Sequence, residues 1–156
     1  MGFAVRYNRR VFDTPTRHLR ESLRMLTELS DSYDYDLENR AMERLPAILS
    51  SEHGIAVEQP FVRRFVEYPD GGVDEVNVYG RGRRNGTEVT IVGEAKARPG
   101  KGDVDHFLKL VTRLERNGWI AGEPFLLLIG HSIRPETERY ARSRNVAVVP
   151  SCRFGG

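Results

Sequence analysis

Apolar positions in the first third of the chain recur every three or four residues, a spacing that predicts helices. Thr14-Pro15 has the form of an N-cap followed by proline in the first helical turn, and leucines repeat at helical spacing from there to Leu29. A polar stretch over residues 30–36 then favours a break, and a second helix is expected over residues 37–51. Pro46 lies inside that second pattern and should kink or split it.

From residue 55 onward apolar and polar positions alternate, a period of two that is typical of strands. Three strands are expected, over residues 55–66 with a break at Pro60, over 73–79 and over 88–97. The pair Asn85-Gly86 stands between the last two, and Asn-Gly between alternating segments is the strongest short-range signal for a two-residue hairpin turn. These two strands are therefore predicted to form an antiparallel hairpin.

The last third of the chain alternates helical and strand patterns. A helix is expected over residues 102–117, a buried strand over 124–130, a helix over 134–143 and a final strand over 146–149. A strand-helix-strand unit joins two parallel strands by a crossover. The predicted fold is therefore of the α/β class, a mixed β-sheet flanked by helices, with an N-terminal helical segment.

The chain has 156 residues, enough for one domain to bury a core without disulfides or metals. Its 39% hydrophobic and 29% charged residues are typical of a soluble protein, and no apolar run is long enough to cross a membrane. Cys152 is the only cysteine, which excludes an internal disulfide and a cysteine-based zinc cluster. We therefore expect a cytoplasmic protein with no membrane partner.

The charges are unevenly distributed, although the formal net charge is only +2. Residues 28–58 carry eight acidic side chains against two arginines, whereas residues 81–101 carry six basic side chains against two acidic ones. This asymmetry is typical of an edge that faces a polyanion such as nucleic acid. A solvated charged surface without a partner explains it equally well.

The candidate chemistry lies in the predicted hairpin. Counting outward from a turn at Asn85-Gly86 sets Asn77 opposite Glu94, and the next pair on the same face is Glu75 with Lys96. On a solvated face, Glu75 and Lys96 would form a simple cross-strand ion pair. Both strands have the pattern of interior strands, however, and ionisable groups beneath a helix are costly unless they share a ligand or a metal ion. A functional site is therefore favoured.

The segment Ile91-Val92-Gly93-Glu94-Ala95-Lys96 ends the second hairpin strand, follows an acid-bearing strand and precedes a helix. In this motif, and in the order of elements over residues 37–150, the chain resembles the PD-(D/E)XK nuclease superfamily, which includes many restriction endonucleases and the archaeal-type Holliday junction resolvases. The resemblance implies a restriction endonuclease-like fold and an endonuclease, a hydrolase of DNA phosphodiester bonds. It also implies that acidic side chains hold Mg²⁺ or Mn²⁺ and that a lysine orients or activates the attacking water.

Carried over residue by residue, the resemblance makes Glu94 the acid and Lys96 the lysine of the Glu-X-Lys tripeptide. Family members often carry a further metal-binding acid on the preceding helix, for which Glu43 is the first choice and Glu38 the second. Asn77 departs from the family pattern, because the register places an amide where the family has a metal-binding aspartate.

Three explanations of this amide are open. In the first, Glu75 replaces the missing acid from the same face of the strand. In the second, a one-residue bulge brings in Asp74. In the third, metal binding is impaired. In the nuclease hypothesis, Glu94 and Glu75 hold the metal ion and Asn77 is an uncharged auxiliary ligand.

The segment Gly80–Arg84 is interpreted as the tip of a flexible hairpin whose guanidinium groups grip a DNA backbone. An exposed turn made soluble by arginine is an equally good explanation. The candidate nucleic-acid-binding residues are Arg81, Arg83, Arg84, Arg98 and Lys101.

Two parts of the chain are expected: residues 1–36, an N-terminal arm and helix, and residues 37–156, the nuclease-like domain. The helix over residues 15–29 carries a narrow leucine seam on a charged body, and such a helix often pairs with a copy of itself. The first hypothesis is a homodimeric, metal-dependent nuclease acting on DNA. The alternative is a catalytically degraded nuclease fold that serves as a DNA-binding or oligomerisation module. A more distant third is a structural domain that binds no nucleic acid.

Overall fold

The structure is a computed structural model that describes the backbone of residues 9–155 and the side chains of residues 15–155. Residues 1–8 of the expected N-terminal arm lie outside the described residues. The chain divides into two compact units, Met1–Tyr33 and Asp34–Gly156, and helix α1 (Arg9–His53) contributes to both. Within the described range, no helix is long and apolar enough to cross a membrane.

Helix α1 is continuous over the region in which the sequence predicts two helices. The predicted start at Thr14-Pro15 and the predicted break over residues 30–36 are therefore wrong. Serine, aspartate and tyrosine each disfavour a helix by only about 0.5 kcal/mol relative to alanine, which is too little to stop one on its own. The turns that follow are firmly packed, because their side chains Leu37, Ala41, Leu45 and Leu49 are fully buried.

Pro46 does not split α1, although proline removes the backbone hydrogen bond that would run from its nitrogen to the carbonyl of Met42. Its neighbours along the buried face, Leu45 and Leu49, are fully enclosed. Their burial outweighs one lost hydrogen bond, so the helix continues to His53.

One mixed sheet lies at the centre of the second unit, with the strand order β1-β3-β4-β5-β6 and with β2 also paired to β3. Its strands are β1 (Ala56–Val57), β2 (Val62–Glu67), β3 (Val73–Arg84), β4 (Thr87–Ala95), β5 (Glu123–Gly130) and β6 (Val146–Pro150). Strand β3 is antiparallel to β4, whereas β4, β5 and β6 are parallel. The parallel strands are joined through α2 (Lys101–Arg116) and α3 (Pro135–Ser143), and a 3₁₀ turn, η1 (Ser151–Phe154), follows β6. The predicted α/β class is confirmed.

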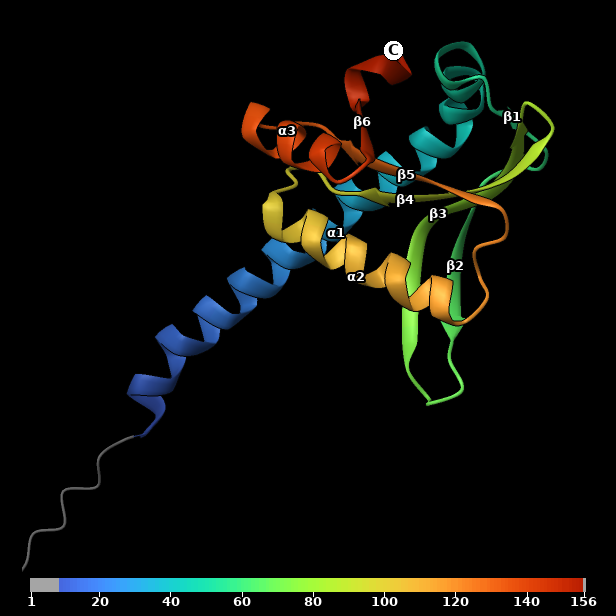
Figure 1. The fold of residues 1–156 in the computed structure, drawn as a ribbon. Helices are drawn as coiled ribbons and strands as arrows, with labels where there is room; N and C mark the ends of the chain where they lie inside the picture. The colour runs from blue at the N-terminus through green and yellow to red at the C-terminus, as the bar shows by residue number, and fades with distance from the viewer. Residues whose placement is uncertain (1–8, 156) are drawn as a thin grey trace, which may run out of the picture. The chain divides into compact units, whose positions relative to one another are not determined.

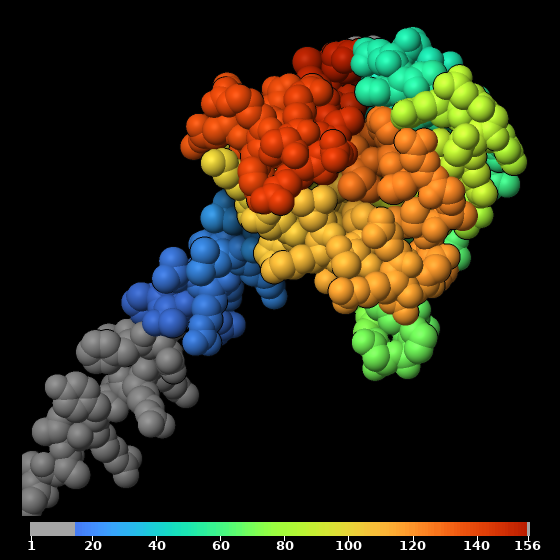
Figure 2. All heavy atoms as spheres, in the orientation of Figure 1, coloured from blue at the N-terminus to red at the C-terminus, as the bar shows by residue number. Residues whose placement is uncertain are grey.

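Helices cover both faces of this sheet (Figure 1). The core on one face is formed with α1, where Leu49 packs with Ile91 of β4. The core on the other face is formed with α2, where Phe107 packs with Val92 and Leu128. Figure 2 shows this second face covered by α2 in yellow and orange and by α3 in red-orange. Polar side chains that enter the sheet from either side therefore need a partner.

The hairpin of β3 and β4 turns at Asn85 (φ 51°) and Gly86 (φ 78°), as the sequence predicts. Residue pairs run from Arg84 with Thr87 to Val78 with Gly93, so the predicted register is confirmed over this stretch.

The segment Gly80–Arg84 is not a flexible tip, and that prediction is wrong, because the segment is the end of β3 and pairs with both β1 and β4. Its glycines admit close neighbours: a Cβ atom on Gly80 would lie 2.5 Å from Cδ1 of Phe61. The glycines therefore serve packing of the strand rather than mobility of a loop.

Candidate functional site

A β-bulge in β3 lies beside the end of β4. The register between β2 and β3 shifts by one residue, so that Asn77 and Val78 together lie opposite Arg63. The extra residue breaks the alternation of side chains, because Val76 belongs to the core beneath α2 whereas Val78 belongs to the core beneath α1. Residues that precede the bulge therefore point to the opposite face from the one that an unbroken strand would give them.

This bulge places Asp74 on the α2 side of the sheet, where Arg113 binds it. Arg113 donates two hydrogen bonds of 2.6 and 2.9 Å to the carboxylate, and the Tyr68 hydroxyl donates a third of 2.8 Å. The hydrogen bonds from Arg113 lower the pKa of Asp74. A bulge is thus present, as one explanation of Asn77 requires, but Asp74 is not among the charged groups that act on Glu94.

The amide of Asn77 links the two hairpin strands. Its Oδ1 accepts a 3.1 Å hydrogen bond from the backbone N–H of Ala95, just beyond the last paired residues of the ladder. The predicted pairing of Asn77 with Glu94 is therefore replaced by a contact from side chain to backbone. The same oxygen retains a second lone pair, which leaves it able to accept one further group or to contact a cation.

The four hairpin residues do not share one face, and that prediction is wrong because of the bulge. Adjacent side chains of a strand point to opposite faces, and Val76 belongs to the core beneath α2. Its neighbour Glu75 therefore lies on the α1 side, where its charge acts on Glu38 of α1. Glu94 follows the same alternation from Val92 and lies on the α2 side. Segments from α1 and α2 both contact the chain at the end of β4: Asp34 accepts a hydrogen bond from the N–H of Ala97, and Asp103 pairs with Lys96.

Glu94 is the most strongly perturbed acid there. It is partly buried, and this burial is the main cause that raises its pKa to about 7. The charges of Glu38, Asp103 and Asp34 raise the pKa further, while Lys96 opposes the rise. A carboxyl with one ammonium and three carboxylates around it sits in an excess of negative charge, which a bound cation would relieve.

Lys96 is held in place by Asp103 of α2. Its Nζ lies 3.3 Å from Oδ1 of Asp103, and the other carboxylate oxygen accepts a 2.8 Å hydrogen bond from the backbone N–H of Gly100. Burial lowers the pKa of Lys96, but the charges of Asp103, Asp34 and Glu94 outweigh that effect, and the resulting pKa is raised. Lys96 is therefore an ammonium at neutral pH.

The two helix acids differ in their surroundings. Glu38, the second choice from the sequence, is buried at 6% exposure and forms an ion pair with Arg63 of β2. Burial raises the pKa of Glu38, Arg63 opposes the rise, and Glu75 and Asp34 add to it. Glu43, the first choice, is exposed, and its charge acts on neither Glu38 nor Glu94. Of these two acids, Glu38 is therefore the one whose charge acts on Glu94.

Two further acids whose charges act on Glu94 were not predicted from the sequence. Asp34 of α1 accepts a 2.8 Å hydrogen bond on its Oδ1 from the backbone N–H of Ala97, and so ties α1 to the end of β4. It was missed because it lies in the polar stretch predicted as a break. Asp103 carries a usable signal, since an acid in the first turn of a helix is a common partner of the N-cap residue, here Gly100.

The oxygen donors near Glu94 are of the type that Mg²⁺ prefers, but they do not form a complete set of protein ligands. Among residues 15–155, no three Asp, Glu, His or Cys side chains are grouped so as to hold a metal ion. Mg²⁺ is usually bound through one or two carboxylates and several waters. The charges of Glu38 and Asp34 both act on Glu94, and the Asn77 amide oxygen binds the N–H of Ala95 next to it, so these residues are the candidates from which such ligands would come.

Each of the three arginines of β3 has a side-chain partner within the protein. Arg81 lies 3.6 Å from Glu88 and Arg83 lies 2.8 Å from Glu58 in ion pairs, both largely exposed. The guanidinium of Arg84 stacks over the ring of Phe125 at 5.3 Å. Such partners weaken the electrostatic attraction of these arginines for a DNA backbone.

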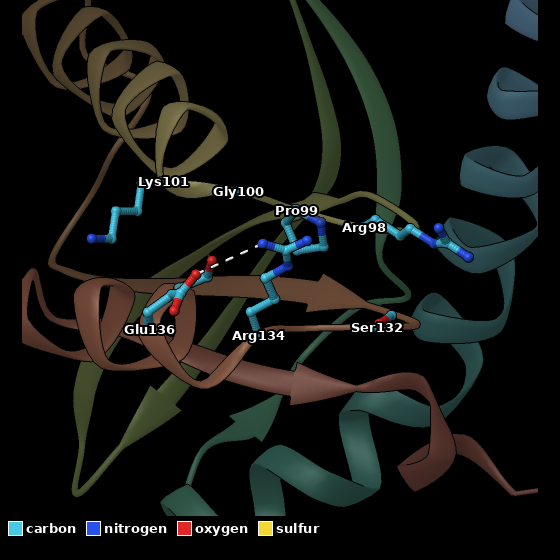
Figure 3. Close-up of a pocket in the computed structure, with 8 residues that line it drawn as sticks. Arg98, Pro99, Gly100, Lys101, Ser132, Arg134 and Glu136 are labelled. Carbon is cyan, nitrogen blue, oxygen red and sulfur yellow. Dashed lines mark ion pairs between the residues drawn. The ribbon is translucent and has the colours of Figure 1, made fainter.

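Arg98 and Lys101 line a pocket of about 530 Å³, together with Arg134, Glu136 and uncharged neighbours (Figure 3). Arg134 extends from the start of α3 toward Pro99, while Lys101 and Arg98 lie on either side of it. We call this hollow the basic pocket.

No protein-family model, curated protein or solved structure matches the chain. The structure shows a mixed α/β domain with a perturbed glutamate and a fixed lysine two residues apart, at the end of a central strand.

Proposed function

We propose that the chain is a divalent-metal-dependent endonuclease with a restriction endonuclease-like fold, similar to the PD-(D/E)XK superfamily, that hydrolyses DNA phosphodiester bonds with Mg²⁺ or Mn²⁺. The observation that carries the proposal is the pair Glu94 and Lys96 at the end of β4. It combines a carboxyl with a pKa of about 7, inside a cluster of carboxylates, with an ammonium that Asp103 holds in place. An antiparallel hairpin continued by parallel strands supports the same fold.

Each residue has a distinct role in this proposal. Glu94 and a neighbouring carboxylate, Glu38 or Asp34, hold the metal ion, with Asn77 as an auxiliary oxygen ligand. A bound ion supplies Lewis-acid polarisation of the phosphoryl group and a lowered pKa for the attacking water. Lys96 stays charged, so it stabilises the negative charge that develops at phosphorus rather than acting as a base. Asp103 is a positioning residue, because it acts through Lys96.

The test is cleavage of branched and linear DNA by the purified chain in Mg²⁺, in Mn²⁺ and in EDTA. Glu94→Gln and Lys96→Ala should each lower the cleavage rate at least about a hundredfold, because each removes a charge that acts in the transition state. Glu43→Gln changes an exposed carboxyl of α1 outside the cluster and should cleave like the wild type. Undiminished cleavage by Glu94→Gln would exclude the proposed site.

Metal binding gives a second readout that needs no DNA. Mg²⁺ should raise the melting temperature of the wild type, because it binds only the folded chain, and should have no such effect on Glu94→Gln. A wild type that neither binds metal nor cleaves DNA would instead support the alternative, a degraded nuclease fold that works as a binding or assembly module.

Self-assembly is a second candidate function, favoured by the exposed leucines of the first unit. Leu19, Leu23, Leu26 and Leu29 recur at helical spacing along α1 and are between 54% and 62% exposed. A row of exposed leucines on one helix is typical of a surface that a partner covers.

The partner that fits best is a second copy of this chain. Along α1, residues 17–24 carry three arginines and one glutamate, whereas residues 28–36 carry four acids, three of them exposed, and no basic residue. We infer that two copies form a homodimer with their α1 helices antiparallel, since that arrangement sets the basic stretch of each helix against the acidic stretch of the other.

A further inference from the structure

The basic pocket lies where two loops of the second unit meet. One loop follows β4 and leads into α2, and the other follows β5 and leads into α3. The carbonyl of Ala97 accepts hydrogen bonds of 3.0 Å from the N–H groups of both His131 and Ser132, which fastens the two loops together. A Cβ atom on Gly130 would lie 2.9 Å from Cδ of Pro99, so only glycine permits this close approach. The walls of the pocket are therefore fixed by the backbone.

The charges of the pocket are strongly unbalanced. Arg98, Lys101 and Arg134 line it against a single acid, Glu136. Arg134 and Glu136 lie 3.9 Å apart at well-exposed positions, which makes a weak pair. Arg98 and Lys101 take part in no ion pair within the described part of the chain. These two cations differ in this respect from the arginines of β3, whose charges are met by carboxylates at Arg81 and Arg83.

Helices α2 and α3 both begin at the pocket, and each carries acidic side chains in its first turn. At α2, Asp103 accepts a 2.8 Å hydrogen bond from the backbone N–H of Gly100. At α3, Glu136 and Glu138 lie in the first turn. These acids offset the partial positive charge of the helix starts, so the positive charge of the pocket comes from its three basic side chains.

We propose that the basic pocket binds a phosphate group of a nucleic acid strand through Arg134, with the exposed side chains of Lys101 and Arg98, which extend to either side of it, turning toward the bound phosphate. Phosphate oxygens accept the charge-assisted hydrogen bonds that guanidinium and ammonium groups donate. The pocket lining begins two residues after Lys96, and Lys96 contacts Asp103 in the same first turn of α2 as Lys101, so the pocket adjoins the proposed reaction site. The nucleic acid as the source of the phosphate rests on the proposed nuclease function, whereas the phosphate site itself does not.

Two kinds of phosphate share this chemistry: an internal phosphodiester with one negative charge, and a terminal phosphate with nearly two at neutral pH. Three cations against one carboxylate suit the terminal phosphate better, because each added charge strengthens the attraction. The experiment separates the two sources.

Binding is measured without divalent metal, in EDTA, by titration calorimetry with inorganic phosphate and by fluorescence anisotropy with single-stranded oligonucleotides. The oligonucleotides share one sequence and carry a 5′-phosphate, a 3′-phosphate or hydroxyl groups at both ends. Arg134→Gln and Lys101→Gln should each weaken binding of the preferred oligonucleotide about tenfold, the usual effect of losing one charge-assisted hydrogen bond. Arg142→Gln alters an arginine of α3 that pairs with Glu138 outside the pocket, and it should bind like the wild type.

Glu136→Gln gives a test whose expected result, tighter binding, is opposite to the effect of misfolding. It removes the only acid of the pocket lining and should tighten binding several-fold, whereas a damaged fold would weaken it. A wild-type preference for one phosphorylated end that is lost in Arg134→Gln identifies a terminal phosphate. Equal binding of all three oligonucleotides that weakens in the pocket variants identifies an internal one.

The phosphate site is rejected if the pocket variants bind every probe as tightly as the wild type does, or if Glu136→Gln has no effect. Measurement in EDTA keeps failure of this proposal distinct from failure of the nuclease. A chain that cleaves no DNA in Mg²⁺ can still show binding that weakens in Arg134→Gln and tightens in Glu136→Gln, because the pocket lining contains no residue of the proposed metal site.

Discussion

Glu94 keeps its proton to higher pH in the folded chain than in the unfolded chain, because burial raises its pKa from 4.5 to about 7. Below the lower value the carboxyl is protonated in both states, and its titration does not affect stability. As the pH rises from there to about 7, the unfolded chain releases the proton first, so the free energy of unfolding falls. Above that range the folded wild type carries a carboxylate in an unfavourable place.

Glu94→Gln should therefore be more stable than the wild type at alkaline pH. The difference in the free energy of unfolding should reach the order of 2 kcal/mol at about pH 8 and shrink toward zero at about pH 4. Urea denaturation across this range measures it, with Glu43→Gln as the control that should follow the wild type. A difference that does not change with pH would mean that the Glu94 carboxyl titrates normally. Saturating Mg²⁺ should reduce the difference, since the ion stabilises the carboxylate.

Single residues of the site could be predicted unequally well. Glu94 and Lys96 follow from the tripeptide at a strand end, and Asp103 carries the signal of an acid in the first turn of a helix. The choice of Glu43 over Glu38 was avoidable, because Glu38 stands three and seven residues before the buried Ala41 and Leu45 and therefore shares their face. The binding of Asp74 by Arg113 could not be predicted, since those residues are thirty-nine apart in sequence and meet only in the fold.

At the scale of elements, the features set by local turn residues could be predicted from the sequence, whereas the features set by contacts between distant strands could not. The Asn85-Gly86 turn fixes the hairpin register, and the structure follows that register as far as Val78 with Gly93. The bulge beyond it depends on β2, which places Arg63 opposite two residues of β3. No periodic pattern within β3 itself encodes that arrangement, so the predicted shared face of the four polar residues was wrong.

Helix α1 carries the prediction on assembly. The double substitution Leu23→Lys with Leu26→Lys should convert a dimer into a monomer, because it sets charges into the apolar seam of both helices. Sedimentation velocity at several concentrations measures the change. Arg17→Lys with Glu28→Asp alters exposed side chains of the same helix but keeps both charges, so it serves as the matched control and should remain dimeric. A wild type that sediments as a monomer at every concentration contradicts the prediction.

The direction of pairing is tested by disulfide formation in a Cys152→Ser background, since Cys152 is the only cysteine. A mixture of Leu19→Cys and Tyr33→Cys chains should cross-link to each other in an antiparallel pair, because the two positions lie on either side of the seam centre at Leu26. Cross-linking of Leu19→Cys to itself instead would indicate a parallel pair.

At the scale of the whole molecule, Asp74 joins helix to sheet. Its carboxylate receives hydrogen bonds from Arg113 of α2 and from Tyr68, in the turn between β2 and β3. Burial is the main cause that raises the pKa of Tyr68 to about 12, and its hydrogen bond to Asp74 adds to the rise. The contact thus connects three segments on one side of the molecule, away from the carboxylates around Glu94.

Asp74→Asn should lower the free energy of unfolding by about 1–2 kcal/mol at neutral pH, because the partly exposed ion pair with Arg113 is lost. The pKa of Asp74 is lowered from 3.8 in the folded chain, so its contribution is present above that pH and is lost as the pH falls through the folded value. Denaturation at neutral and acid pH measures the difference. Cleavage should be unchanged, and a folded Asp74→Asn chain without activity would assign Asp74 to the metal site after all.

The bulge at Asn77 and Val78 also bears on how such a chain can evolve. One extra backbone residue shifts the phase of every side chain before it by half a strand period. Deletion of either bulge residue would therefore exchange the positions of Asp74 and Glu75, turning the first toward α1 and the second toward Arg113. A chain of this kind can change which carboxylate faces α1 and which faces α2 by the gain or loss of a single codon, with no substitution of any acidic residue.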